Sequence, residues 1–317
     1  MVPALVLTAG LATRLRPLSL VRAKGAMPVA GTPLVRRILA WLASQGVTEA
    51  VFNLHHLPHS LTALIGDGGD LGVTVRYSWE TPLLGSAGGP ARALALLTRA
   101  GRTFLIVNGD TLTDMNPGAL VAQHRASGAL VTMAVVPNVA PDKYGGVLLD
   151  TDGGVTGFSR RGSGVPSFHF IGVQAAEPEA FASVPVDVPY ESVGTLYPAL
   201  IATRPGSIRA FRTAAECLDI GTPGDYLATS LLLAARETGH DAATTHAEVR
   251  ASARVEDSVL WDDVVVEDGA RVRACVVTDS VRIPADTSWR GVTVRVAAGT
   301  LAPGETRIGE LAVASLA

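Results

Sequence analysis

Short apolar runs rich in β-branched residues alternate with amphipathic stretches over the first two-thirds of the chain. The stretch 33–45 is typical of a helix, because Leu34, Ile38 and Leu42 share one face and Gly46 follows as a stop signal. The pattern predicts strands at 5–8, 50–54, 74–78, 104–107 and 130–136, and further helices at 60–65, 90–98 and 116–127. This order favours an α/β fold, a Rossmann-like, mainly parallel sheet with helices on both faces. Ligands of such sheets bind beyond the carboxyl ends of the strands.

The alternation changes after residue 137. Short strands are predicted at 145–149, 155–159 and 168–174, then a helix near 193–202, which together indicate a β-rich insert on the parallel sheet. A helix over 225–236 closes this part of the chain. We therefore predict one α/β domain over residues 1–236, followed by a polar linker over 237–248.

The remaining residues, 249–317, have a period of their own. Pairs of small or branched residues recur, each pair six residues after the one before: Ser258/Leu260, Val264/Val266, Ala270/Val272 and Val276/Thr278. A six-residue period is typical of a β-helix built from hexapeptides, with a plain β-meander as the alternative. Only four or five hexads are visible, so we expect the coil to pack on the rest of the chain or on another subunit as a homo-oligomer.

Composition narrows the class of protein. Hydrophobic residues make up 48% and charged residues 17% of the 317 residues, which is enough apolar material for a sizeable core. The net charge of −3 gives no general attraction to nucleic acid or to an anionic membrane. No apolar run approaches the length of a membrane span, and two cysteines, Cys217 and Cys275, make no disulfide framework. The expected location is the cytoplasm.

The strongest local motif follows the first predicted strand. Residues 8–18 (TAGLATRLRPL) combine small residues with Arg14 and Arg16, so backbone N–H groups and guanidinium groups can approach phosphate oxygens. The loop lacks the lysine of a Walker A motif and the later glycines of a dinucleotide-binding fingerprint. From its residues alone, a phosphate site and a structural turn both remain open.

Three further charged residues favour the phosphate site over the structural turn. Lys24 lies among small residues just behind the loop, and Asp110 and Asp219 each follow a short apolar run. A carboxylate where a buried strand meets the ligand crevice is well placed to hold Mg²⁺. The two carboxylates together with a basic glycine loop indicate a nucleoside triphosphate site.

These motifs resemble those of the sugar-1-phosphate nucleotidyltransferases, the nucleotide-sugar pyrophosphorylases. The resemblance covers roughly residues 3–235 and rests on four stretches in the family's order: 10–25 (GLATRLRPLSLVRAKG), 80–88 (ETPLLGSAG), 108–110 (NGD) and 219–226 (DIGTPGDY). The C-terminal hexads are similar to the left-handed β-helix that many members carry. The resemblance implies transfer of a nucleoside monophosphate from a nucleoside triphosphate to a sugar 1-phosphate, with release of pyrophosphate.

The resemblance also implies roles for individual residues. Arg14, Lys24 and Asp110 would be catalytic, and Mg²⁺ would be held by Asp110 and Asp219. The nucleotide would lie against Leu7, Ala9, Gly10, Thr13, Glu80, Gly85 and Ser86. The sugar phosphate would lie against Gly146, Arg161 and Gly172.

Three departures from the family pattern stand out. Ala12 replaces a glycine, so we expect Ala12 to have an ordinary negative φ. Ala23 and Gly25 replace the prolines that flank the family's lysine. Arg160 and Arg161 replace a glutamate and a lysine on the sugar side; Arg161 can still hold a phosphate, but Arg160 has no acceptor for sugar hydroxyls.

The motifs do not decide between two pairs of substrates. GTP with mannose 1-phosphate is slightly favoured over UTP with a hexose or N-acetylhexosamine 1-phosphate. A non-catalytic regulatory paralogue is the alternative, although the retention of Arg14, Lys24, Asp110 and Asp219 argues against it. An acetyltransferase would need more hexads than the tail contains.

Overall fold

The computed structural model describes residues 2–98, 102–240 and 242–316. The chain forms two compact units, each assembled from separate stretches of sequence. The first unit contains Met1–Gly10, Ile38–Pro58 and Ile65–Leu218, and the second contains Leu11–Arg37, His59–Leu64 and Asp219–Ala317. The predicted boundaries at residues 236 and 248 stay a prediction.

A nine-stranded sheet forms the centre of the first unit. Its main path is β10-β9-β11-β6-β1-β4-β5, with β8 beside β11 and β12 beside β8. Neighbours in the run β6-β1-β4-β5 are all parallel, and β11 joins this run antiparallel to β6. The strands are β1 (Ala4–Leu7), β4 (Glu49–Leu54), β5 (Thr74–Trp79), β6 (Phe104–Asn108), β8 (Val131–Pro137), β9 (Gly146–Leu149), β10 (Val155–Ser159), β11 (Phe168–Ala176) and β12 (Ile208–Arg212). The predicted β-rich insert is therefore continuous with the parallel strands.

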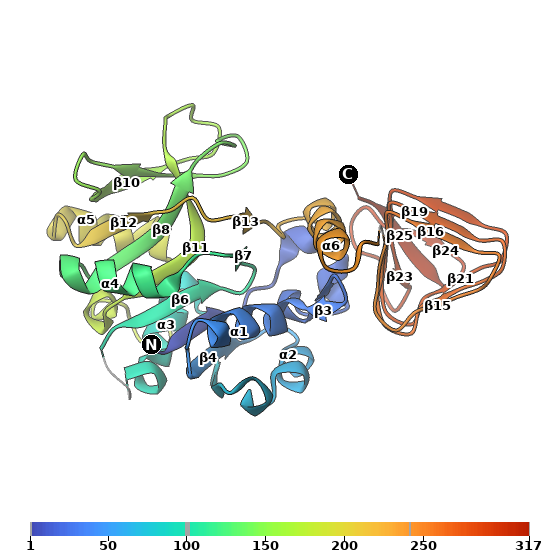
Figure 1. Ribbon diagram of the computed structural model, residues 1–317, viewed down its shortest axis with the longest axis horizontal. Helices are drawn as coiled ribbons and strands as arrows, with labels where there is room; N and C mark the ends of the chain where they lie inside the picture. The colour runs from blue at the N-terminus through green and yellow to red at the C-terminus, as the bar shows by residue number, and fades with distance from the viewer. Residues whose placement is uncertain (1, 99–101, 241, 317) are drawn as a thin grey trace. The chain divides into compact units, whose positions relative to one another are not determined.

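Helices cover both faces of this sheet, as predicted (Figure 1). On one face, β6 and β8 contribute Ile106, Val131 and Met133 to a core cluster with α3 (Gly85–Leu97) and α5 (Tyr197–Thr203). Thr132 alternates with these core residues and contacts α4 (Pro117–Ser127) on the opposite face, through His124. Burial on both faces explains why the strands are apolar without alternation.

The strands and most helices lie where the sequence predicts them, but α3 begins five residues before the predicted start at Pro90. A proline ordinarily marks the first turn of a helix, since its missing N–H is not needed there. Here the N–H groups of Ala87 and Gly88 both donate to the carbonyl of Tyr190, at 2.9 and 3.2 Å. This tertiary contact satisfies the first turn and extends the helix in front of Pro90.

The second unit contains α6 (Pro223–Thr238), the short hairpin of β2 (Pro28–Val29) and β3 (Thr32–Pro33), and the predicted β-helix. Figure 1 shows three parallel sheets as the sides of a coil, drawn in orange and red. The first is β14 (Ala243–Thr244), β17 (Val259–Leu260), β20 (Val276–Val277) and β23 (Val292–Val296); the second is β15 (Glu248–Val249), β18 (Val265–Val266) and β21 (Arg282–Ile283); the third is β16 (Arg254–Glu256), β19 (Arg271–Arg273) and β22 (Ser288–Arg290). The β-meander alternative is thereby excluded. The predicted linker overlaps the end of α6 and contains β14.

One coil of this β-helix is 17 residues long, since Val259 pairs with Val276 and Val265 with Arg282. Three strict hexads would need 18 residues, so the six-residue period shortens once per coil. The predicted pairs are all buried, but the inward-facing pair of the next coil is Cys275 and Val277 rather than Val276 and Thr278. The last pair predicted from the six-residue period, Val276/Thr278, therefore lies one residue beyond the inward-facing pair of the structure.

The last two strands of the chain add to the β-helix. A β-hairpin of β24 (Thr306–Ile308) and β25 (Leu311–Ser315) extends the first sheet of the coil, with β25 antiparallel to β23.

Among the described residues, no helix is long and apolar enough to cross a membrane.

Candidate active site

The carboxyl ends of three parallel strands lie side by side in the first unit. Leu7 at the end of β1 is the register partner of both Asn53 on β4 and Asn108 on β6. The N–H groups of Thr8 and Ala9 donate to Oδ1 of Asn53, at 2.6 and 3.3 Å, and the Thr8 hydroxyl donates to the Asn53 carbonyl at 2.6 Å. Asn53 therefore holds the first residues of the glycine loop as the chain leaves β1.

Asn53 is also bonded to the next predicted site residue, Glu80. The Asn53 Nδ2 group donates to Oε1 of Glu80 at 2.7 Å, and the N–H of Leu84 donates to its Oε2 at 2.8 Å. Asn53 is 3% exposed and Glu80 2% exposed, so both oxygens of a buried carboxylate are used inside the protein. Glu80 thus ties the glycine loop to the loop before α3, whereas the sequence predicted that it lines the nucleotide; that role stays a prediction.

Gly85 and Ser86 lie where α3 begins, against residues 190–192. Gly85 has a φ of 75°, and a Cβ there would stand 2.6 Å from Oε1 of Glu191, so both conformation and packing require glycine. The Ser86 hydroxyl donates to Glu191 at 2.7 Å and accepts from the Ser192 N–H at 2.8 Å. The loop 80–88, called the base loop here because it is predicted to line the nucleotide, is thereby joined to residues 190–192, for which the sequence predicted no role.

Two glycines at the strand ends differ in what surrounds them. A Cβ on Gly109 would stand 2.4 Å from the Leu7 carbonyl oxygen, so Gly109 is required for β1 and the turn after β6 to approach. A Cβ on Gly10 would have nothing within 4 Å, and Gly10 is exposed. Among the described residues, none comes within 4 Å of that position, which leaves room for a ligand close to the backbone at Gly10.

The turn that carries Asp110 contacts one of the predicted sugar-side glycines. Gly172 lies in an irregular part of β11 with a φ of 80°, and a Cβ there would stand 2.2 Å from Oγ1 of Thr111 and 3.0 Å from Nδ2 of Asn108. Asp110 is half-buried and lies between Asn108 and Thr111 in the sequence. The structure therefore brings Gly172 together with the Asn-Gly-Asp motif.

The other sugar-side candidates lie at the far strands of the same sheet. Gly146 on β9 is the register partner of Ser159 on β10, and a Cβ on Gly146 would clash with the hydroxyl of Ser167. Arg160 and Arg161 follow Ser159 directly, and both are exposed. Their side chains thus lie on the surface at the end of β10.

Thr13, Arg14, Lys24 and Asp219 belong to the second unit. Arg14 is exposed on a short 3-10 turn, Thr13–Leu15. Ala12 precedes this turn with a φ of 47°, so the expectation of an ordinary φ was wrong. The left-handed conformation costs alanine about 1 kcal/mol relative to glycine, and the family's glycine at this position avoids that cost.

Lys24 and Asp219 are both half-buried within the second unit. Lys24 begins a 3-10 turn, Lys24–Ala26, in which the N–H of Met27 donates to the Lys24 carbonyl at 3.2 Å. Asp219 precedes α6, and its carbonyl accepts from the Thr229 hydroxyl at 2.8 Å. The backbone at both residues is thus fixed by hydrogen bonds.

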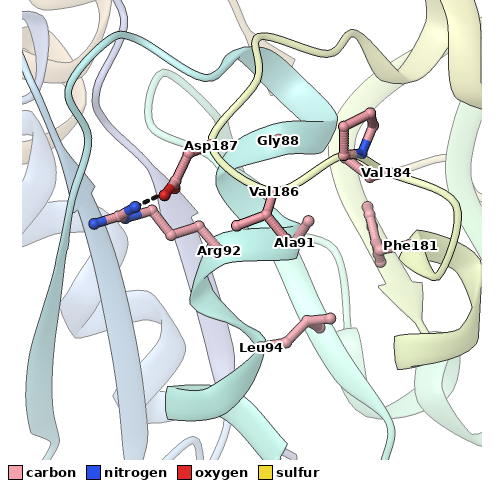
Figure 2. A pocket seen from close by; sticks show the side chains of 9 residues that line it. Gly88, Ala91, Arg92, Leu94, Phe181, Val184, Val186 and Asp187 are labelled. Atoms are coloured by element: carbon pink, nitrogen blue, oxygen red, sulfur yellow. Dashed lines mark hydrogen bonds and ion pairs between the residues drawn. The ribbon is translucent and has the colours of Figure 1, made fainter.

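A pocket of about 330 Å³ lies beside α3 in the first unit. Figure 2 shows Ala91 and Leu94 of the helix on one side and Phe181 on the other, with an ion pair between Arg92 and Asp187 at the rim. Its lining is mostly apolar and contains none of the predicted site residues.

Comparison with known proteins identifies the family of the chain. Residues 3–171 match the family model described as nucleotidyl transferase, and residues 237–292 match the GlmU-like C-terminal hexapeptide model. The chain is 28% identical to mannose-1-phosphate guanylyltransferase of Mycobacterium tuberculosis, over 84% of this chain and 82% of that protein. It is 34% identical to N-acetylmuramate alpha-1-phosphate uridylyltransferase of Neisseria meningitidis, over 69% of this chain and 93% of that protein.

Solved structures support the fold. The crystal structure of HddC from Yersinia pseudotuberculosis aligns with a TM-score of 0.65 at 21% identity, over 74% of this chain and all of that chain. The resemblance predicted from the motifs is confirmed: the chain belongs to the nucleotidyl transferase family, with curated enzymes among its relatives and a hexapeptide segment at its C-terminal end.

Proposed function

We propose that this protein transfers a nucleoside monophosphate from a nucleoside triphosphate to a sugar 1-phosphate, with release of pyrophosphate. The observation that carries the proposal is the hydrogen-bonded alignment of the glycine loop with the base loop through Asn53 and Glu80. This alignment leaves the backbone at Gly10 open at the carboxyl end of β1. A ligand can therefore approach the backbone closely at Gly10.

The chemistry requires cations rather than a general base. The attacking oxygen of a sugar 1-phosphate is already an anion, so the barrier comes from bringing two polyanions together and from charge on the α-phosphate. Arg14 would hold the β- and γ-phosphates, and Lys24 the α-phosphate and the incoming phosphate. Leu7, Ala9, Gly10, Thr13, Gly85 and Ser86 would line the nucleotide, and Glu80 would act by ordering the loop before α3.

The carboxylates of Asp110 and Asp219 suit a magnesium ion. Each is half-buried and lies close behind a short apolar run, Asp110 in the turn after β6 and Asp219 directly after Leu218. Among the described residues no group of three or more His, Cys, Asp or Glu side chains could form a closed metal site. Two carboxylates leave coordination positions for phosphate oxygens and water, which is the usual arrangement for Mg²⁺. When bound, the ion would neutralise charge on the α-phosphate.

On the sugar side, Arg161 would bind the phosphate of the sugar, with backbone near Gly146 and Gly172 toward its hydroxyls. The contact of Gly172 with the turn after β6 supports this, because that turn carries Asp110. Arg161→Ala should raise the KM for the sugar 1-phosphate about tenfold, since a charge-assisted phosphate contact is lost. Arg160→Ala is the matched control and should change that KM little.

For the substrates we favour GTP with mannose 1-phosphate. The guanylyltransferase of Mycobacterium tuberculosis matches over a larger share of this chain than the muramate uridylyltransferase does. UTP with an N-acetylated sugar 1-phosphate is the second candidate, because the uridylyltransferase relative has the higher identity. We also propose self-association through the β-helix, which sedimentation of the full chain would test.

Pyrophosphate release from four nucleoside triphosphates, each crossed with a panel of sugar 1-phosphates, tests the proposal. Mannose, glucose, N-acetylglucosamine and N-acetylmuramate 1-phosphates cover the candidates. We expect one pair to exceed the others and to require Mg²⁺. Release in no combination, from protein that binds triphosphate, would contradict the transferase and favour a regulatory protein.

A further inference from the structure

The segment that carries Lys24 is held by a charged cluster from the β-helix, within the second unit. Arg22 lies two residues before Lys24. Its Nε and Nη2 donate to the two carboxylate oxygens of Asp279 at 2.7 and 2.6 Å, and Nη2 also donates to Asp262 at 2.5 Å. This bidentate geometry fixes a guanidinium group in orientation as well as in position.

The two carboxylates come from successive coils of the β-helix. Asp262 follows β17 and Asp279 follows β20, and these two strands pair in parallel with a register of 17 residues. The N–H of Asp262 also donates to the Asp279 carboxylate at 3.2 Å. The side chains of Arg22, Asp262 and Asp279 are 17%, 27% and 25% exposed. The guanidinium carbon also lies 5.4 Å from the ring centroid of Trp261. Arg22 is therefore clamped by adjacent coils in a partly desolvated site.

A second anchor lies on the other side of Lys24. The hydroxyl of Tyr226 on α6 donates to the carbonyl of Pro28 and accepts from Nε1 of Trp261 at 2.8 Å. Tyr226 and Trp261 are fully buried, and burial raises the pKa of Tyr226 far above its usual value, so the hydroxyl keeps its proton. The same tryptophan thus contacts both anchors, which enclose the 3-10 turn at Lys24.

A third contact extends the anchoring beyond the hairpin. Arg37 donates to the carbonyl of Val29 at 2.8 Å and forms two bonds with the Glu237 carboxylate of α6, at 2.6 and 2.8 Å. The segment from Arg22 to Arg37 is therefore held at both ends and in the middle by α6 and the first coils of the β-helix.

From these contacts we propose that Asp262 and Asp279 are positioning residues for Lys24, so that the β-helix acts in the reaction as well as in assembly. The inference rests on the proposed role of Lys24 toward the phosphates. Reacting groups misplaced by about 1 Å lose on the order of 100-fold in rate, even when the change is remote. A positioning role therefore predicts a loss in kcat rather than in substrate affinity.

The test uses the full-length chain with the double variant D262N/D279N, which keeps side-chain volume and removes both charges. Glu267→Gln is the matched control, because Glu267 pairs with Arg250 and Arg282 on the β-helix. Two measurements are made on each protein: kcat and KM for the triphosphate with its best sugar 1-phosphate, and amide hydrogen exchange of residues 20–29.

For the double variant we expect exchange of residues 20–29 to increase and kcat to fall by about tenfold or more, with KM changed less than about twofold. Glu267→Gln should match wild type in both. Arg22→Lys should be intermediate, since it keeps the charge and loses the bidentate geometry. Unchanged exchange in the double variant would overturn the inference, as would increased exchange with unchanged kcat. A wild-type protein without transferase activity would instead contradict the proposed function, and exchange would still report whether the clamp orders this segment.

Discussion

The two loops expected to meet the triphosphate are held in different ways. In the first unit, the start of the glycine loop at Thr8 and Ala9 is held by Asn53, which in turn donates to the Glu80 carboxylate; Asn53 and Glu80 are at most 3% exposed. In the second unit, the Lys24 segment is held by a charged cluster in which Arg22 and its two carboxylates are 17–27% exposed. A fully buried carboxylate such as Glu80 requires hydrogen-bond donors at its oxygens, because an unsatisfied charge is expensive there, whereas a partly hydrated site tolerates ion pairs.

The two clusters also differ in how far apart their members lie along the chain. The first joins residues 27 and 45 positions apart on neighbouring strands, so the sheet register alone assembles it. The second joins residues 240 and 257 positions apart, so it forms only when the tail has folded. The glycine loop therefore depends on the sheet, and the lysine depends on the β-helix.

The largest effect is expected from the two carboxylates proposed as metal ligands, one in each unit. Asp110→Ala in the first unit and Asp219→Ala in the second should each reduce turnover by at least about 100-fold, because each removes an anionic ligand of the metal. Turnover at saturating Mg²⁺ measures this, with Asp152→Ala on an exposed turn as the control. Near-normal turnover in both aspartate variants would end the metal assignment.

Removal of Asn53 tests the buried cluster of the first unit. Asn53→Ala should lower the free energy of unfolding by about 1–3 kcal/mol, because it leaves the Glu80 carboxylate and the Thr8 N–H without their partner in a buried site. It should also raise the KM for the triphosphate. Denaturant unfolding and steady-state kinetics measure the two effects. The control is Gln123→Ala, which removes one hydrogen bond from α4 to the Ala210 carbonyl of β12. It should lower the free energy of unfolding less than Asn53→Ala does and leave the KM for the triphosphate unaltered.

Substitutions of the two glycines at the strand ends distinguish a role in packing from a role in ligand approach. Gly109→Ala should destabilise the fold by about 1–3 kcal/mol, since its methyl group would overlap the Leu7 carbonyl. Gly10→Ala meets open space and should change the unfolding free energy by less than about 0.5 kcal/mol while weakening triphosphate binding. Equal stability losses in the two variants would contradict this distinction.

The smallest expected effect concerns a buried histidine of the first unit, away from both loops. Burial lowers the pKa of His124, and the neighbouring Glu177 offsets this only in part. The unfolded chain then binds more protons than the folded chain below about pH 6.5, so stability should fall as pH decreases through that value. Unfolding free energies at about pH 7.5 and 5.5 should differ less in His124→Gln than in wild type. An equal difference in both proteins would contradict the assignment.

Individual residues show where prediction from the sequence succeeded. The strand ends and the Asn-Gly-Asp turn were predictable, because buried parallel strands are apolar throughout and end at polar residues. Asn53 was missed, although a buried polar residue at the end of the strand 50–54 was visible; only the register shows that it meets Thr8 and Glu80. The φ of Ala12 could not be predicted either, since local preference opposes it.

The sequence by itself determined the alternation of strands and helices, the family motifs and the hexapeptide period, because burial and turn chemistry act on neighbouring residues. Only the tertiary structure decided the early start of α3, the 17-residue coil and the clamp of Arg22 between two turns of the β-helix. Each of these depends on a partner distant in sequence, namely the Tyr190 carbonyl, the next coil and Asp279. A pattern within one stretch carries no information about such partners, because their contact energies appear only when the chain is folded.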